Sequence, residues 1–123
     1  MNDIATKADI ELLVTKFYEQ VIPDDVIGVF FTKVANFSWE EHIPVLVSFW
    51  NSLLLGANSY KGNPMIKHIE LNELLPLEAP HFERWLQLWV KTVHDNFAGP
   101  KADEAISRAQ NIAGVMQLKI KQS

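Results

Sequence analysis

Helical spacing of the apolar residues is the feature that most constrains what this chain can fold into. In the first 21 residues one helix face is formed by Ile10, Leu13, Val14, Phe17 and Val21. Thr6 and Asp9 are typical of a capping pair at the start of this helix, and Pro23 ends it. No segment of useful length alternates apolar and polar residues, as strands would. We therefore predict an all-α protein.

The next helical segments are bounded by proline, glycine and a capping box. Residues 23–34 are expected to form a short helix, because they open with proline and two acids. Ser38 and Glu41 form an S-x-x-E box at the start of a second long helix, which Gly56 ends. Pro44 lies inside this helix and removes one hydrogen bond, so a local kink is predicted there.

The second half of the chain predicts two further long helices. Residues 56–64 are a loop by composition, and residues 64–71 allow at most a turn or two of helix. A third long helix begins near Pro80 and ends at Gly99 and Pro100. Its apolar stripe is Phe82, Trp85, Leu86, Trp89, Val93 and Phe97. The stripe of the last helix is Ile106, Ala109, Ile112, Ala113, Met116 and Ile120.

Composition limits the classes of protein to consider. The chain has 123 residues, 48% of them hydrophobic, which predicts one domain over residues 1–123. Fifteen acids against 11 scattered Lys and Arg argue against nucleic-acid binding. The absence of cysteine excludes disulfides, thiolate metal sites and covalent haem attachment. No secretory signal is visible, and the apolar run 43–57 is too short to span a bilayer, so we expect a cytoplasmic protein without membrane contact.

Familiar enzyme motifs are absent, which leaves the four histidines as candidates for chemistry. A di-iron bundle needs two Glu-x-x-His motifs, and the chain has a single match at Glu78 and His81. His81 and His94 are expected at the surface. His42 and His68 differ from them, because both lie among apolar residues.

Three predicted helices each direct a hydrogen-bond donor toward a common interior. These donors are Tyr18, His42 and Trp85. A buried polar group without a partner costs about 1–3 kcal/mol, so either the three satisfy one another or a polar group lies between them. A ligand bound to a metal ion would be such a polar group. The plain alternative for His68 is a core histidine with a backbone partner, and the plain alternative for Trp85 is core packing.

These residues resemble those of the truncated haemoglobins, and among them the third group. The resemblance covers nearly the whole chain. It rests on KFYEQV (16–21), SWEEHIPVLVSFWNSLLLG (38–56), YKGNPMIKH (60–68) and FERWLQLW (82–89). Members of this group carry a Phe-Tyr pair, a distal histidine, a later Phe-Trp pair, a proximal histidine and a tryptophan. The matching positions are Phe17-Tyr18, His42, Phe49-Trp50, His68 and Trp85.

The resemblance implies a truncated globin fold, a 2-on-2 helical sandwich around non-covalent haem b. It makes His68 the proximal iron ligand, and the separation of 26 positions between His42 and His68 suits a chain that passes both sides of a flat cofactor. The haem-binding residues expected with it are Phe31, Leu46, Phe49, Trp50 and Lys67. Lys67 would pair with a propionate or stay solvated. Tyr18, His42 and Trp85 would be distal, although Pro44 leaves open whether His42 points inward, gates the pocket or binds ferric iron.

Three functions follow from these expectations. The first is reversible binding of a diatomic gas, O2, NO or CO, at a pentacoordinate haem iron. The second uses the same pocket for enzymatic NO dioxygenation or peroxidase-like chemistry, with an electron-donating reductase as partner. The third is a cofactor-free helical bundle that acts as an interaction module. The sequence names neither the physiological ligand nor the oligomeric state.

Overall fold

Four α-helices make up most of the part of the chain that the computed structural model describes, residues 1–30, 39–56 and 78–122. They are α1 (Lys7–Val21), α2 (Trp39–Leu55), α4 (Ala79–Asn96) and α5 (Pro100–Gln122). No strand occurs within these three ranges, and the all-α prediction is confirmed. Of the short segment predicted over 23–34, residues 23 and 25–27 lie in turns and residues 28–30 are helical, while residues 31–34 lie outside the described residues. Ser38 of the predicted capping box also lies outside the described residues.

Helix α1 follows its sequence pattern closely. The Asp9 amide donates to the Thr6 hydroxyl oxygen at 3.2 Å, and the Thr6 amide donates to the Asp9 carboxylate at 3.0 Å. This capping box satisfies amides that have no partner inside the helix. All five residues of the predicted stripe are buried, and Tyr18 is buried with them. The predicted start, end and inward face of this helix are confirmed.

Helices α4 and α2 show how proline is tolerated in helices. Pro80 lies in the first turn of α4, where its missing N–H costs no hydrogen bond. The Glu78 amide just before the helix donates to the His81 ring Nδ1 at 2.8 Å, so the lone Glu-x-x-His match is a helix start. Pro44 lies inside α2, which runs on through it to Leu55.

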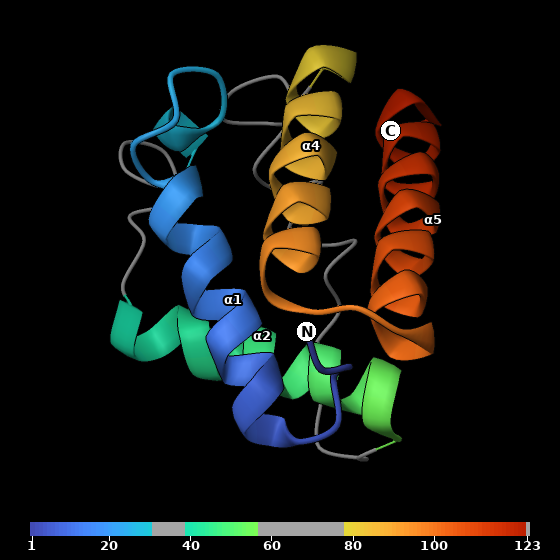
Figure 1. The fold of residues 1–123 in the computed structure, drawn as a ribbon. Helices are drawn as coiled ribbons and strands as arrows, with labels where there is room; N and C mark the ends of the chain where they lie inside the picture. Colours follow the sequence, from blue (N-terminus) through green and yellow to red (C-terminus); the bar gives the residue numbers. More distant parts are fainter. Residues whose placement is uncertain (31–38, 57–77, 123) are drawn as a thin grey trace.

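The helices share one core (Figure 1). Helix α4 packs along α5 on one side and against α1 on the other, while α2 crosses beneath α1. Against α4, helix α5 presents small residues, which lets the two helices approach closely. These buried residues are Ala102, Ala105, Ala109 and Ala113. The Trp89 indole N–H of α4 donates to the Ala105 carbonyl of α5 at 3.1 Å.

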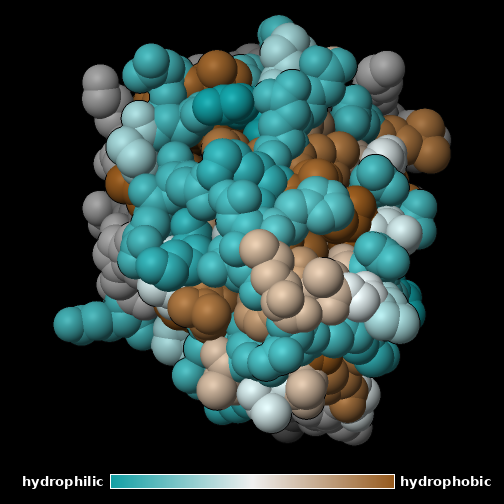
Figure 2. Space-filling view, in the orientation of Figure 1, coloured by the Kyte–Doolittle hydropathy of each residue, from teal (hydrophilic) through white to brown (hydrophobic). Residues whose placement is uncertain are grey.

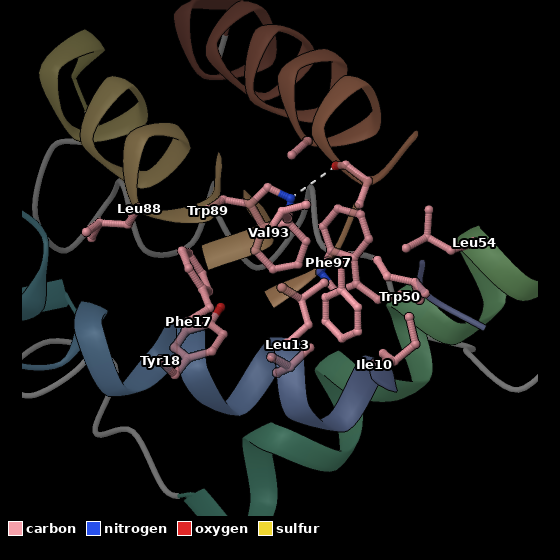
Figure 3. Close-up of a cluster of buried hydrophobic side chains, with 14 of the residues drawn as sticks. Ile10, Leu13, Phe17, Tyr18, Trp50, Leu54, Leu88, Trp89, Val93 and Phe97 are labelled. Atoms are coloured by element: carbon pink, nitrogen blue, oxygen red, sulfur yellow. Dashed lines mark hydrogen bonds between the residues drawn. The ribbon is translucent and has the colours of Figure 1, made fainter. Parts of the chain in front are cut away.

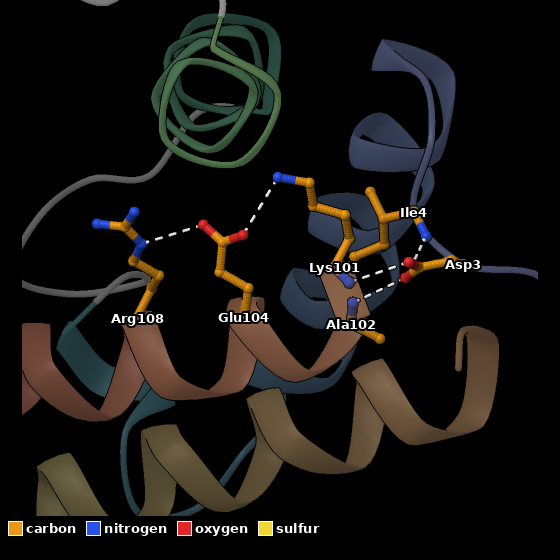
Figure 4. A network of polar contacts seen from close by, with 6 residues as sticks. All are labelled: Asp3, Ile4, Lys101, Ala102, Glu104 and Arg108. Carbon is orange, nitrogen blue, oxygen red and sulfur yellow. Dashed lines mark hydrogen bonds and ion pairs between the residues drawn. The ribbon is translucent and has the colours of Figure 1, made fainter. Parts of the chain in front are cut away.

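The N-terminal segment caps α5 from 97 residues away (Figure 4). Gly99, just before α5, has φ +141° and offers no side chain to the first amides of the helix. The Asp3 carboxylate takes that place, accepting from the amides of Lys101 at 2.9 Å and Ala102 at 2.8 Å. A Cβ on Gly99 would lie 2.6 Å from the Asp3 Cγ, so glycine is required by both its φ and this contact.

The surface is mixed rather than dominated by one character. On the face shown in Figure 2, hydrophilic residues cover most of the area and hydrophobic side chains appear between them. None of the helices searched, over the described residues, is long and apolar enough to cross a bilayer.

Candidate functional site

Among the candidate site residues, Tyr18 of α1 is buried in the core. Its side chain is only 7% exposed, on the same helix turn as the fully buried Phe17. Burial raises the pKa of Tyr18 well above its ordinary value, because the anionic phenolate would be poorly solvated there. The hydroxyl is protonated at neutral pH, as in an ordinary tyrosine, and burial extends this state to higher pH.

The Phe17 ring, which lies beside Tyr18 and Trp89 in Figure 3, connects Tyr18 with the candidate residue Trp85 on α4. It meets the Tyr18 ring edge-to-face at a centroid distance of 4.9 Å and the Trp85 indole edge-to-face at 5.9 Å. Edge-to-face contacts at these distances are favourable and fix the relative ring planes. Tyr18 and Trp85 thus come from different helices to the same aromatic cluster. The rings of two of the three predicted donors therefore both contact Phe17, while the prediction that the three donor groups face one interior stays a prediction.

Trp89 is the centre of this cluster, and it stacks on the next candidate residue, Trp50 of α2. Their ring centroids are 4.4 Å apart with planes 21° from parallel. Trp89 also meets Phe17 at 5.0 Å and lies nearly parallel to Trp85 at 6.3 Å. Trp50 is 4% exposed, so in the structure it is a core residue as well as a haem-binding candidate.

The remaining candidates on α2 form one face of that helix. His42, Leu46 and Phe49 follow one another at intervals of four and three residues, and each is only partly buried. Leu46 and Phe49 pack against the core, and the Phe49 ring lies edge-to-face with Trp50 at 5.4 Å. The structure thus brings Phe49 and Trp50 to the aromatic cluster, and places His42 near the start of the same helix.

The described candidates fit a flat apolar cofactor in one respect. Trp85, Leu46 and Phe49 pack on the core yet keep part of their apolar surface uncovered. Apolar side chains of this kind are what lines small-molecule sites, and a porphyrin would cover such a surface. Three of the expected haem-binding residues, Phe31, Lys67 and His68, lie outside the described residues. Their roles, and those of the other candidates toward haem, stay predictions.

Sequence reasoning missed the polar contacts that join α1 to α4. Asp24, just after α1, pairs with Arg84 of α4, and Gln20 of α1 donates to the Thr92 hydroxyl. Asp24 was expected to favour a helix N-terminus, which is a local role, and no pattern in the sequence links it to a residue 60 positions away. Trp89 was assigned to the inward stripe, but its central position was not predicted. His94 is exposed, as expected.

Comparison with known proteins identifies the family of this chain. The family model described as "Bacterial-like globin" matches residues 2–118. The group 3 truncated hemoglobin Ctb of Campylobacter jejuni subsp. jejuni serotype O:2 is 33% identical over 104 residues, which are 82% of this chain and 80% of that protein.

The fold agrees as well. The crystal structure of a group III truncated hemoglobin from Campylobacter jejuni superposes with a TM-score of 0.86 at 30% identity, covering 98% of this chain and 95% of that one. The predicted truncated globin fold is therefore confirmed, and a haem cofactor is what this family implies. The chain belongs to the bacterial-like globin family.

Proposed function

We propose that this protein binds non-covalent haem b at a pentacoordinate iron and takes up a diatomic gas, O2, NO or CO, in a pocket that Tyr18 and Trp85 border. The observation that carries the proposal is the aromatic cluster in which Phe17 contacts both side chains. The relative from Campylobacter is named a truncated hemoglobin, which supports the same activity here. Residues 1–123 would form one globin domain.

His68 is the proposed proximal ligand. It stands in an apolar stretch, and a single neutral imidazole is the usual globin ligand. Its second ring nitrogen would donate to a backbone carbonyl or water, which fixes the tautomer. Phe31, Leu46, Phe49 and Trp50 would supply apolar contacts to the cofactor, and Lys67 a cation near a propionate. Haem iron, when bound, supplies the position at which the gas binds.

Tyr18 and Trp85 would stabilise a bound gas by donating hydrogen bonds. The Tyr18 hydroxyl is protonated at neutral pH, as in any tyrosine, and burial raises its pKa further. A donor in a buried site acts on a partly negative ligand more strongly than it would in water, and it slows dissociation. His42 is partly buried and is proposed as a third donor, as a gate or as a ferric-iron ligand.

Replacing His68 tests the proposal. In His68→Gly, free imidazole has room to replace the missing side chain. We expect the variant to lose the ferrous five-coordinate haem spectrum and to regain it when imidazole is added. His94→Ala, which changes an exposed histidine on α4, is the matched control and should keep the spectrum of the parent protein. An unchanged five-coordinate spectrum in His68→Gly without imidazole would end the assignment of the proximal ligand.

The enzymatic alternative is favoured by the same pair of donors, since polar distal groups also promote O–O bond activation. It requires a reductase that nothing in the chain identifies. Turnover of NO or peroxide measured with an electron donor, beside the rates of simple binding, separates the two activities. The cytoplasmic location expected from the sequence stays a prediction.

A further inference from the structure

The Asp24 carboxylate, which lies in the turn after α1, accepts three hydrogen bonds. Its side chain is 5% exposed, and one carboxylate oxygen accepts from the Arg84 Nε at 2.8 Å. The other oxygen accepts from the amides of Val26 at 2.9 Å and Ile27 at 3.2 Å. A buried carboxylate is stable only when it is bonded in this way. Asp24 therefore fixes the turn after α1 and ties that turn to α4.

The other partner of the ion pair stands beside a candidate site residue. Arg84 directly precedes Trp85 on α4, and its Nη1 also donates to the Gln87 side chain at 3.3 Å. The guanidinium is therefore held at two points. Because Arg84 and Trp85 are consecutive on one rigid helix, holding Arg84 against the end of α1 limits how the helix can rotate and where the Trp85 indole can lie.

The turn that carries Asp24 is itself closely packed. The Gly28 amide donates to the Asp24 carbonyl at 2.9 Å, and a Cβ at Gly28 would lie 2.5 Å from the Ile22 carbonyl oxygen. The turn thus lies directly against the C-terminal end of α1. A residue of α4 that is bonded to this turn is therefore also held relative to α1, the helix that carries Phe17 and Tyr18.

A second polar contact joins the same two helices farther along. Gln20 Nε2 donates to the Thr92 hydroxyl at 2.9 Å, and that hydroxyl donates to the Leu88 carbonyl at 2.6 Å. Thr92 lies eight residues after Arg84, or about 12 Å along the helix. Only the Asp24–Arg84 contact adjoins Trp85 in sequence, so the Gln20–Thr92 contact provides a matched comparison.

We propose that the Asp24–Arg84 ion pair is a positioning contact for the distal pocket: it holds the Trp85 indole in its edge-to-face contact with Phe17, beside Tyr18, and so sets how slowly a diatomic ligand leaves. This inference rests on the proposed function. A planar guanidinium that bonds a buried carboxylate fixes direction as well as distance, which apolar packing alone does not.

Substitution on both helices tests the inference in the haem-loaded protein by stopped-flow measurement of O2 dissociation. Asp24→Asn keeps the size of the side chain and a carbonyl for the turn amides but removes the charge. Arg84 is 39% exposed on its side chain, so it stays solvated and the variant should fold. Arg84→Lys serves as a milder second variant.

We expect Asp24→Asn to speed O2 dissociation about three- to tenfold, the effect of one weakened hydrogen bond to the ligand. Gln20→Met, which breaks the other contact between α1 and α4, should change this rate less than about twofold while also lowering stability. In a Trp85→Phe background, Asp24→Asn should not change the rate of O2 dissociation any further. A full effect in that background, or equal effects of Asp24→Asn and Gln20→Met, would overturn the proposal.

A spectroscopic measurement gives a result that does not depend on haem. Protein labelled with 5-fluorotryptophan gives fluorine NMR signals from its tryptophans, and the Trp85 signal is the one lost in Trp85→Phe. We expect Asp24→Asn to shift or broaden this signal and Gln20→Met to leave it in place. An unmoved Trp85 signal in a protein with a normal haem spectrum overturns the positioning role alone. If the parent protein takes up no haem and Asp24→Asn still moves the Trp85 signal, the positioning of Trp85 is supported and the proposed function is overturned instead.

Discussion

Helix α4 has two sides that differ in how they are built. Toward α5 it packs on alanines, with the Trp89 indole donating to the Ala105 carbonyl. Toward α1 it presents Trp85, which is only partly buried, and two polar contacts with side chains of α1 and the turn after it. The α4–α5 side, which we call the closed side, packs on small buried residues. The α4–α1 side is held by directional contacts around an aromatic residue that keeps uncovered surface.

Two tryptophans one helical turn apart thus differ in burial, and we propose that they differ in role as well. Trp89 is 1% exposed and contacts three other aromatic rings, so its contribution is to stability. Trp85 contacts Phe17 and Trp89 but leaves part of its indole accessible, as a residue that meets a ligand must. Substitutions at these two residues test the comparison.

The largest effect is expected from Trp89→Ala. Removing a fully buried indole leaves a cavity beneath Trp50 and Phe17, and such changes cost about 3–5 kcal/mol in the free energy of unfolding. Trp85→Ala should cost clearly less, because part of that side chain is already exposed. Urea unfolding followed by circular dichroism measures both. Equal losses would mean that the two sides of α4 are not distinct.

Tyr18→Phe should act mainly on ligand binding. The ring and its contact with Phe17 remain, but the donor is lost, so O2 should dissociate about three- to tenfold faster. Thr92→Val also removes a buried hydroxyl, on the far part of the α1–α4 interface, and is the control that should leave the rate unchanged. If both variants change the rate alike, Tyr18 has no special relation to the ligand.

A smaller effect is expected at Asp3, which belongs to the closed side. Burial opposes the charged form of Asp3, but the amides of Lys101, Ala102 and Ile4 donate to it and lower its pKa below the ordinary value. Because the folded pKa is the lower one, this contact gives its full stabilisation above the unfolded pKa of about 3.8 and loses it as pH falls through the folded pKa.

Asp3→Asn should therefore unfold more easily than the parent protein at neutral pH, and the difference should shrink in acid. The loss is comparable with that of a helix cap, about 1 kcal/mol. Thermal unfolding at pH 7 and at about pH 3 measures it. A difference that grows in acid would contradict the assignment of Asp3 as a charged cap, and O2 dissociation should not change at all.

The sequence predicted features whose causes are local. The stripe and capping box of α1 follow from residues three and four apart, and the break at Gly99 and Pro100 follows from backbone chemistry. The contact between Phe17 and Trp85 was also predictable, since both belong to inward stripes and apolar faces must share a core. The resemblance on the Phe-Tyr, Phe-Trp and FERWLQLW segments gave the fold.

Contacts between distant parts of the chain were not predictable from one sequence. Asp3 caps a helix that starts 97 residues later, while capping rules consider only neighbouring residues. Asp24 and Arg84 look like ordinary surface charges until the fold brings them together. The order of the stacked rings depends on helix rotation, which periodicity leaves undetermined. The role of His68 stays a prediction.

The central claim is that this chain holds haem through His68 beside the Tyr18–Trp85 cluster. Titration of the purified protein with haemin, followed by the intense haem absorption band, tests it most directly. We predict saturable uptake of one haem per chain, with quenching of tryptophan fluorescence because the indoles lie nearby. Uptake should fall sharply in His68→Ala and remain in His94→Ala. A parent protein that binds no haem, or a His68→Ala variant that binds it as well as the parent does, would contradict the account.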